Sequence, residues 1–303
     1  MENVAVCEHH EQFVCKHVGQ GSAENFLKAD ELALIKKAKR SFPRELETAT
    51  QPLKRALRRF FRKIVKREIA KLQRAGTLRL FSSRAGGQVR KAEVTLKKAI
   101  SQKDRKQFGE LVKTYGIRTQ ERAGKRTAKQ LGGKWSVRPE DQTRFIAERE
   151  LVWGKTLNQI NVDLEDTFRD VLVDSANAEP RPGINTITRN LFDAALSAGG
   201  VISPGRAERI ARTEMHVFQN DGIYKGYRAS GIKKLRWVTI MDGRERREKR
   251  TNHALQSNVT VPVGSAFVMK ASGGKLRYPG DTSLGAKPFD TVNCRCTTVP
   301  VIE

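Results

Sequence analysis

Residues 140–176 read EDQTRFIAERELVWGKTLNQINVDLEDTFRDVLVDSA, and this stretch decides the fold class. Its apolar side chains recur every three or four residues, which is the period of one face of an α-helix. Pro180, Pro182 and Gly183 follow the stretch and predict where the helix ends. The predicted inward face consists of Phe145, Val152, Trp153, Leu157, Ile160, Leu164, Phe168, Val171 and Leu172.

Upstream, the same period predicts a basic helix over residues 52–75. We expect an earlier helix to end near Phe42 and Pro43, and this one to begin near Pro52, because proline suits the first helical turn. At 1.5 Å per residue the helix would be a rod about 36 Å long, roughly one turn of duplex DNA. The candidate DNA-binding side chains on its polar face are Lys54, Arg55, Arg58, Arg59, Arg62, Lys63, Lys66, Arg67 and Lys71.

The positive charge is concentrated in one third of the chain. The formal net charge is +25, and residues 36–134 hold 31 Lys/Arg against 7 Asp/Glu. Because like charges repel on a helix face, an external polyanion such as DNA phosphate is the predicted partner, and a merely solvated face is the alternative. Aromatic residues are few there and no helix-turn-helix or zinc-finger spacing is visible, so we expect double-stranded DNA to be bound without sequence specificity.

Length and composition restrict the class of protein further. A chain of 303 residues can hold two domains. No run approaches the ~20 apolar residues of a membrane span, and the N-terminus lacks a secretory signal, so we expect no membrane partner. Four cysteines in two close pairs do not suggest a disulfide framework, so we expect the protein to be located in a reducing cytoplasm.

The hydrophobic period changes after residue 230. The preceding segments predict helices at 88–108, 117–131, 185–198 and 203–230. Short strands separated by Gly, Pro, Asn and Ser are then predicted at 234–240, 259–263, 266–269, 275–278 and 297–302. The predicted fold is therefore α+β, with mainly helical N-terminal two thirds and a small C-terminal α+β domain of short antiparallel strands.

The N-terminal leader, residues 1–20, concentrates side chains that can bind metal. Thiolates and imidazoles are the ligands that zinc prefers, but the spacing matches no standard zinc finger. A leader with chance ligands and a small metal knuckle are the two interpretations. The side chains are Cys7, His9, His10, Cys15 and His17.

A second ligand group is predicted near the C-terminus. Asp242 ends a predicted strand, His253 follows an arginine-rich segment, and Cys294 and Cys296 flank an arginine before the last strand. If the domain closes on itself, His253 and both thiols, with Asp242 or water, would make a tetrahedral zinc site. Alternatively, the two cysteines lie on one face of a strand and simply pack.

Glu214 lies on the predicted inward face of helix 203–230, between Ile210 and Val217. A carboxylate buried alone is costly, so it should have a cationic or hydrogen-bonding partner. A structural ion pair is the main interpretation, and a catalytic carboxylate is the other.

Four short motifs occur in order within the last hundred residues, and none is decisive alone. They are Arg212-Thr213-Glu214, Asp242-Gly243-Arg244-Glu245-Arg246 leading to His253, Tyr278-Pro279-Gly280-Asp281, and Asn293-Cys294-Arg295-Cys296. In this order they resemble the C-terminal domain of the phage Mu F-like minor head proteins, also called phage head morphogenesis proteins. The resemblance covers about residues 185–300 and includes Arg212, Glu214, Asp242, His253, Asp281 and Asn293 as motif positions.

The resemblance implies a minor head (capsid) protein of a tailed double-stranded DNA phage. Such a protein would be made in the host cytoplasm, lie inside the head of the virion, and contact the portal and the major capsid or scaffolding protein. It would act in head morphogenesis or DNA delivery. The alternative is a metal-dependent nuclease or toxin-type enzyme built on the C-terminal domain, but no P-loop, His-Glu-x-x-His or nucleophile elbow is present, so we expect no enzyme.

The chain organisation follows from these segments. We expect a Cys/His-rich leader at 1–20, a basic helical arm at 21–135, a long amphipathic connector at 136–183 and a Mu F-like domain at 184–303.

Overall fold

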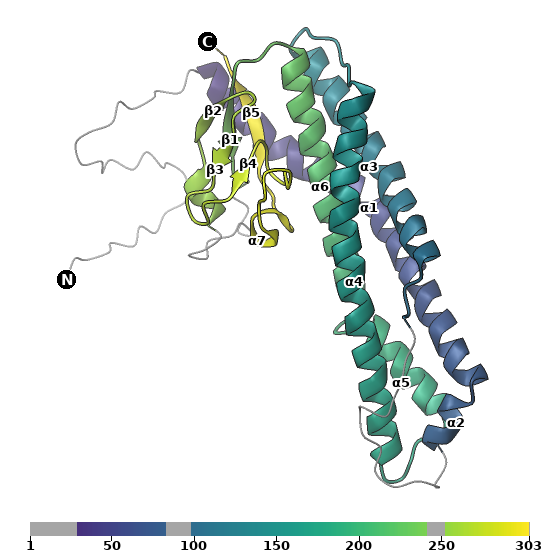
Figure 1. Cartoon of the computed structure of the whole chain (residues 1–303). Coiled ribbons are helices and arrows are strands. Elements are labelled where there is room, and N and C mark those ends of the chain that lie inside the picture. Colours follow the sequence, from purple (N-terminus) through teal and green to yellow (C-terminus); the bar gives the residue numbers. More distant parts are fainter. Residues whose placement is uncertain (1–28, 83–97, 241–251, 303) are drawn as a thin grey trace, which may run out of the picture.

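The computed structural model describes residues 29–82, 98–240 and 252–302 of the chain. Within these ranges the protein is mainly helical with short antiparallel strands near the C-terminus, so the predicted α+β class is confirmed. The helices form an elongated bundle, and the strands lie beside one end of it (Figure 1). The helices are α1 (Ala29–Arg74), α2 (Thr77–Ser82), α3 (Gln102–Gln130), α4 (Pro139–Asn177), α5 (Ile184–Leu196), α6 (Pro204–Ala229), the 3₁₀ helix η2 (His253–Gln256) and α7 (Pro288–Thr291).

One helix, α1, replaces the two that the sequence predicts on either side of residues 43–52, so the predicted break near Phe42 and Pro43 is wrong. Pro43 and Pro52 both lie inside the helix. A proline in a helix interior removes a backbone hydrogen bond, but Phe42, Leu46 and Leu53 beside the prolines are buried in the core. Packing therefore supports a continuous helix that begins near the strands and ends at the far end of the bundle (Figure 1).

α3 is likewise continuous, so the separate helices predicted at 88–108 and 117–131 are also wrong for the part that the structure describes. α3 and α6 pack closely along their lengths, and small residues make this approach possible. A Cβ added to Gly116 of α3 would lie 2.5 Å from the ring of Phe218 on α6. A Cβ on Gly222 of α6 would lie 2.2 Å from the carbonyl oxygen of Gln120 on α3. Both glycines are therefore required by helix packing and do not break either helix.

The strands form two small sheets, and each strand falls within a segment that the sequence predicts. β1 (Lys234–Val238) pairs antiparallel with β2 (Thr260–Pro262) and with β5 (Thr297–Val301), in the order β2-β1-β5. β3 (Phe267–Val268) pairs antiparallel with β4 (Lys275–Leu276).

α6 connects the helical bundle to the strands. It packs on α1 and α3 on one side and on β5 on the other, and one buried apolar cluster runs from Ile35 to Val299. The expected segments 21–135, 136–183 and 184–303 therefore share a continuous core, and the boundaries between them stay a prediction. No helix in the described ranges has both the length and the apolar composition needed to cross a membrane.

Candidate metal centre and basic face

The last turn before β5 places two thiols side by side. α7 ends at Thr291, and Asn293 follows in the left-handed region with φ 55°, a conformation that asparagine tolerates better than most residues. The amide of Cys294 then donates to the Thr291 carbonyl at 3.3 Å, and the amide of Cys296 lies 3.4 Å from the Cys294 sulfur. The two cysteines are two residues apart in an extended segment, so their side chains lie on one face.

A histidine from a different element meets these thiols. His253 begins η2, whose first turn is capped by the Asn252 side chain, which accepts from the amide of Ala254 at 3.0 Å. Thr239, just after β1, donates its hydroxyl to the His253 carbonyl at 2.8 Å. The ring of Trp237 packs edge-on against the imidazole at 6.3 Å between centroids. These contacts orient the imidazole ring of His253 toward β5.

The three side chains have the spacing of metal ligands. His253 Nδ1 lies 3.5 Å from Cys294 Sγ and 3.6 Å from Cys296 Sγ, and all three residues are buried. Ligand atoms at normal zinc–sulfur and zinc–nitrogen bond lengths in a tetrahedron lie about 3.5 Å apart. The ligand atoms of the triad lie within 4.8 Å of one another. These residues therefore fit a zinc ion as ligands, as the sequence interpretation proposed.

The pKa values of the two thiols are shifted in opposite directions. Burial alone would raise the pKa of Cys294, but the hydrogen bond from Cys296 and the nearby His253 and His216 lower it well below its usual range. Burial and the hydrogen bond to Cys294 raise the pKa of Cys296 well above its usual range. The lowered pKa of Cys294 favours its thiolate, which is the form that binds metals.

His216 and Asn220 of α6 surround the triad, and the sequence interpretation did not include them. His216 is fully buried, and its Nε2 lies 2.8 Å from the Cys296 carbonyl oxygen. Asn220 donates to that carbonyl at 3.3 Å and accepts from the Thr297 hydroxyl at 2.9 Å. The only sequence signal was their spacing of four residues, which places both on one helix face. Asp242, the remaining candidate, lies outside the described residues.

The Arg-Thr-Glu motif of α6 contacts two other parts of the chain. Glu214 Oε1 accepts from Arg149 Nη2 of α4 at 2.6 Å, and Glu214 Oε2 accepts from Trp153 Nε1 at 2.8 Å. Arg149 also donates to Thr282 at 3.2 Å. The prediction that Glu214 has a cationic partner is confirmed, and the buried pair joins α4, α6 and the loop after β4.

The remaining motif positions also have hydrogen-bond partners. Arg212 donates to the Asn293 side chain at 3.3 Å, and the Asn293 amide donates to Thr213 at 3.0 Å. Asp281 accepts from the amide of Arg277 at 2.9 Å. The structure therefore joins the Arg-Thr-Glu motif directly to the Asn-Cys-Arg-Cys motif, while Asp281 organises the turn after β4.

The nine candidate DNA-binding residues of α1 separate into two groups. Three are taken up by acidic neighbours: Lys54 pairs with Glu208 at 2.5 Å, Arg67 with Asp104 at 2.8 Å and Lys71 with Glu68 at 2.9 Å. The other six are exposed and have no ion pair to any residue that the structure describes. We call these six the basic face: Arg55, Arg58, Arg59, Arg62, Lys63 and Lys66.

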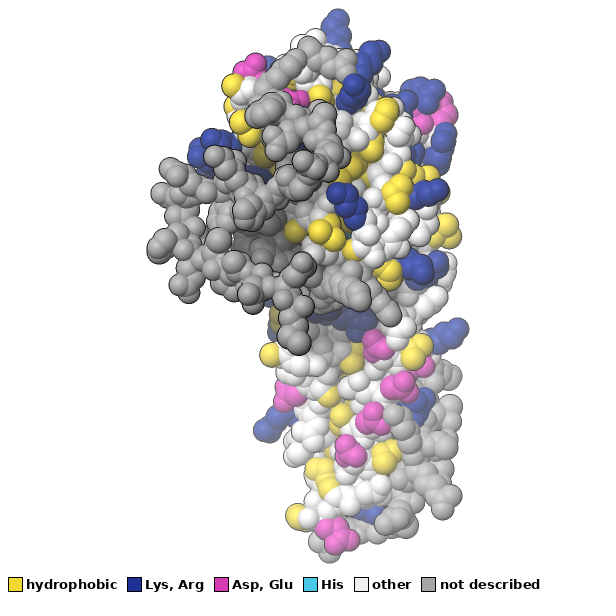
Figure 2. All heavy atoms as spheres, turned by 90° about the vertical axis from the view of Figure 1, so that its left-hand side faces the viewer, with side chains coloured by type: hydrophobic (Ala, Val, Ile, Leu, Met, Phe, Trp, Pro, Cys, Tyr) yellow, Lys and Arg dark blue, Asp and Glu magenta, His cyan; other side chains and the backbone are white. Residues whose placement is uncertain are grey.

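The opposite side of the molecule carries a different charge pattern. Figure 2 shows the left-hand side of Figure 1, away from the second half of α1, and acidic side chains gather there over the lower half. The positive excess is therefore not spread evenly around the bundle. The Cys/His leader, with Cys7, His9, His10, Cys15 and His17, lies outside the described residues.

No family model, no curated protein and no solved structure matches this chain. Function must therefore be inferred from the chemistry of the metal centre, the basic face and the motif positions.

Proposed function

We propose that this protein is a minor head protein of a tailed double-stranded DNA phage, which binds DNA non-specifically and acts in head morphogenesis or DNA delivery. The ordered motifs of the C-terminal region support the family assignment. The six cations of the basic face, which have no ion pair to the described residues, are the observation on which the proposal depends, because they form a positive surface on an otherwise well-packed bundle.

The arrangement of the basic face suits a DNA backbone. The six cations span residues 55–66 of α1, which at 1.5 Å per residue is about 17 Å. Several phosphates along one strand of duplex DNA lie within this length. The two aromatic residues within this span, Phe60 and Phe61, are buried in the core, so contacts would go to phosphate and would carry no sequence preference.

A salt titration with matched variants tests this proposal. If all six cations contact phosphates, log K should fall with log [salt] with a slope of about −5, which is roughly a thousandfold loss between 50 and 200 mM salt. Replacing Arg58, Arg59 and Arg62 with Gln should make the slope about three units shallower. A control variant with Lys129→Gln, Lys134→Gln and Lys155→Gln loses the same charge elsewhere on the exposed surface.

The outcome separates surface-specific binding from a general charge effect. Affinity should be equal for unrelated duplex sequences, and the control variant should keep a slope near that of the natural chain. Equal slopes for the two triple variants, or a flat salt response, would contradict DNA binding by the basic face.

We also propose that His253, Cys294 and Cys296 hold one zinc ion with a structural role. Zinc would join η2 to the start of β5, which are distant in sequence. The triad supplies three of the four ligands of a tetrahedral zinc, and the burial of all three favours a structural site, for which Asp242 is the proposed fourth ligand. This supports an assembly protein over the nuclease alternative. The portal and the major capsid or scaffolding protein are the proposed partners, inside the virion head.

A further inference from the structure

Two adjoining cavities lie between the first half of α1 and the second half of α3. One has a volume of about 180 Å³ and the other about 290 Å³, and both are lined by Glu45 and Arg126. Together they extend along α1 from Leu34 to Ala49, which is about 22 Å at 1.5 Å per residue. We call this feature the α1–α3 groove.

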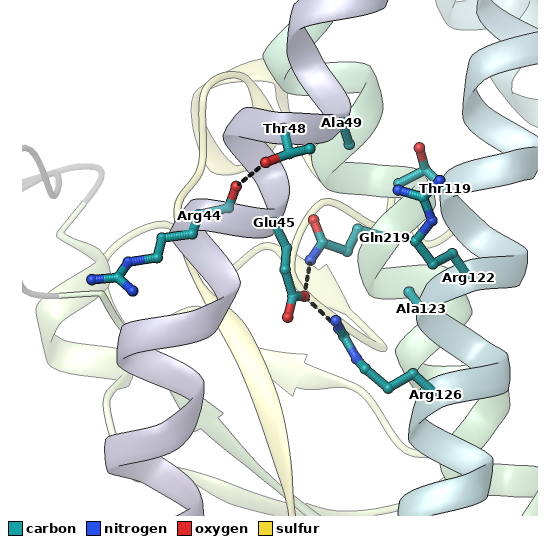
Figure 3. Close-up of a pocket in the computed structure, with 9 residues that line it drawn as sticks. All are labelled: Arg44, Glu45, Thr48, Ala49, Thr119, Arg122, Ala123, Arg126 and Gln219. Atoms are coloured by element: carbon teal, nitrogen blue, oxygen red, sulfur yellow. Dashed lines mark hydrogen bonds and ion pairs between the residues drawn. The ribbon is translucent and has the colours of Figure 1, made fainter.

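The groove combines apolar walls with a basic rim. Among the described residues, Glu45 is the single acidic lining residue, and it already pairs with Arg126 and accepts from Gln219 at 3.2 Å (Figure 3). Arg122 is exposed and has no ion pair within the described ranges. The apolar part is formed by Ala38, Ala49, Phe42, Ala123, Leu131 and Ile223, and the rim by Lys37, Arg44, Arg122 and Arg126.

Two buried polar atoms in this groove lack partners among the described residues. They are Oε1 of Gln219, in the smaller cavity, and Oγ1 of Thr298, in the larger one. Both residues are 2% exposed. An amide oxygen can only accept a hydrogen bond, so Gln219 Oε1 is an acceptor without a donor among the described residues. Buried polar atoms are normally satisfied, so these two atoms mark polar positions in the groove walls that an occupant or a water would complete.

We propose that the α1–α3 groove binds an acidic amphipathic peptide segment of a partner protein. Acidic side chains of the segment would pair with Arg122 at the rim, and its apolar side chains would cover the alanine and phenylalanine walls. The first turn of a helical peptide also has free N–H donors, whereas the DNA backbone has none. The groove is thus distinct from the basic face in position and in ligand chemistry.

The groove allows a partner to bind through side-chain contacts, but it does not allow a partner to add a strand to β5. β5 lines the larger cavity, but the outward carbonyls of Cys296 and Thr298 already accept from Asn220 at 3.3 Å and from Tyr227 at 2.9 Å. These two carbonyls are therefore not free to accept hydrogen bonds from the backbone of an added strand. A helix of about 15 residues matches the length of the groove.

A charge-swap experiment on the full chain tests this site. The probe is a fluorescent peptide of about 15 residues with Leu along one helical face and Glu on both flanks, and its counterpart has Lys in place of Glu. Binding is measured by anisotropy for the natural chain and for Arg122→Glu. The matched control is Arg118→Glu, one turn earlier on α3, where the side chain is exposed and does not line the groove.

We expect Arg122→Glu to weaken binding of the Glu peptide about tenfold or more, and to improve binding of the Lys peptide, while Arg118→Glu changes neither. Equal effects of the two variants, or no binding of the Glu peptide to the natural chain, would overturn the proposal. Binding that appears only after residues 1–28 are removed would also overturn it, because the occupant would then be this chain's own leader.

Discussion

At Cys294 and Cys296, two residues of the same type take opposite roles because their surroundings differ. His253 and His216 stabilise a thiolate at Cys294, whereas Cys296 is the hydrogen-bond donor of the pair. Such an arrangement keeps one negative charge in a buried site, where two would repel strongly. It also leaves a thiolate ready for a metal, and metal binding would release the second proton.

Metal removal tests the proposed role of this triad. Purified natural protein should contain about one zinc per chain by elemental analysis, and a chelator should lower the free energy of unfolding. The loss would be about 4 kcal/mol if free zinc exceeds its dissociation constant a thousandfold. Cys294→Ser with Cys296→Ser should abolish zinc binding, with helical content checked by circular dichroism.

The N-terminal cysteines provide the control for that measurement. Cys7→Ser with Cys15→Ser removes the other candidate ligands and should leave the zinc content unchanged. Zinc that is lost in this variant and kept in the C-terminal one would assign the metal to the leader. Protein without zinc, and with unchanged stability in chelator, would leave Cys294 and Cys296 as packing residues.

At the scale of elements, single buried contacts decide which helices lie together. Arg67 of α1 forms two hydrogen bonds to the Asp104 carboxylate of α3, at 2.8 and 2.9 Å, and one to the carbonyl of Ala99 at 2.7 Å. Asp104 also belongs to the capping box of α3, with Ser101 as the cap. One carboxylate therefore begins α3 and attaches it to the second half of α1.

The Arg67–Asp104 contact should make the free energy of unfolding depend on pH. The burial of Asp104 opposes ionisation, but Arg67 and Ser101 outweigh it and lower the pKa of Asp104 to about 2 from 3.8. Because the folded-state pKa is lowered, the stabilisation is present above pH 4 and is lost as pH falls through 2. The shift corresponds to about 2 kcal/mol.

Urea unfolding at several pH values measures this contribution. The difference in unfolding free energy between the natural chain and Asp104→Asn should shrink by about 2 kcal/mol from pH 5 to pH 2. Glu110→Gln, at an exposed position of the same helix, should show little pH-dependent difference. A constant difference for Asp104→Asn across this pH range would argue against a charged pair.

At the scale of the whole molecule, the protein has two separate surfaces and one buried site. The basic face lies on the second half of α1, the α1–α3 groove lies on its first half, and the metal centre is buried between α6, η2 and β5. A protein with distinct DNA-binding and peptide-binding surfaces could contact packaged DNA and a partner protein together. This geometry suits the proposed place beside the portal.

The proposed location can be checked on assembled particles. Mass spectrometry of purified virions should find this chain in fewer copies than the major capsid protein, and a tagged chain should co-purify with the portal protein. Incubation with plasmid and Mg²⁺ or Mn²⁺ should leave the DNA intact. Absence from virions would contradict the head-protein proposal, and cleavage abolished by His253→Ala would favour the nuclease alternative.

The helical periods, the change to short strands and the concentration of positive charge could all be predicted from the order of residues alone. These features depend on residue spacing along the chain, which local geometry converts directly into faces. The sequence also indicated that Glu214 needs a partner, because its position on the apolar face of a helix implies burial. It indicated that His253, Cys294 and Cys296 suit a metal, because thiols and imidazoles are typical metal ligands.

Which residues meet depends on the packing of distant segments. Arg149 is 65 residues from Glu214, and His253 is 41 residues from Cys294, so no local pattern joins them. Packing also carried α1 through two prolines, against their local preference, and placed Glu208, Asp104 and Glu68 beside three of the nine cations. Spacing along a chain determines which face a side chain lies on, but its partner depends on how distant segments pack.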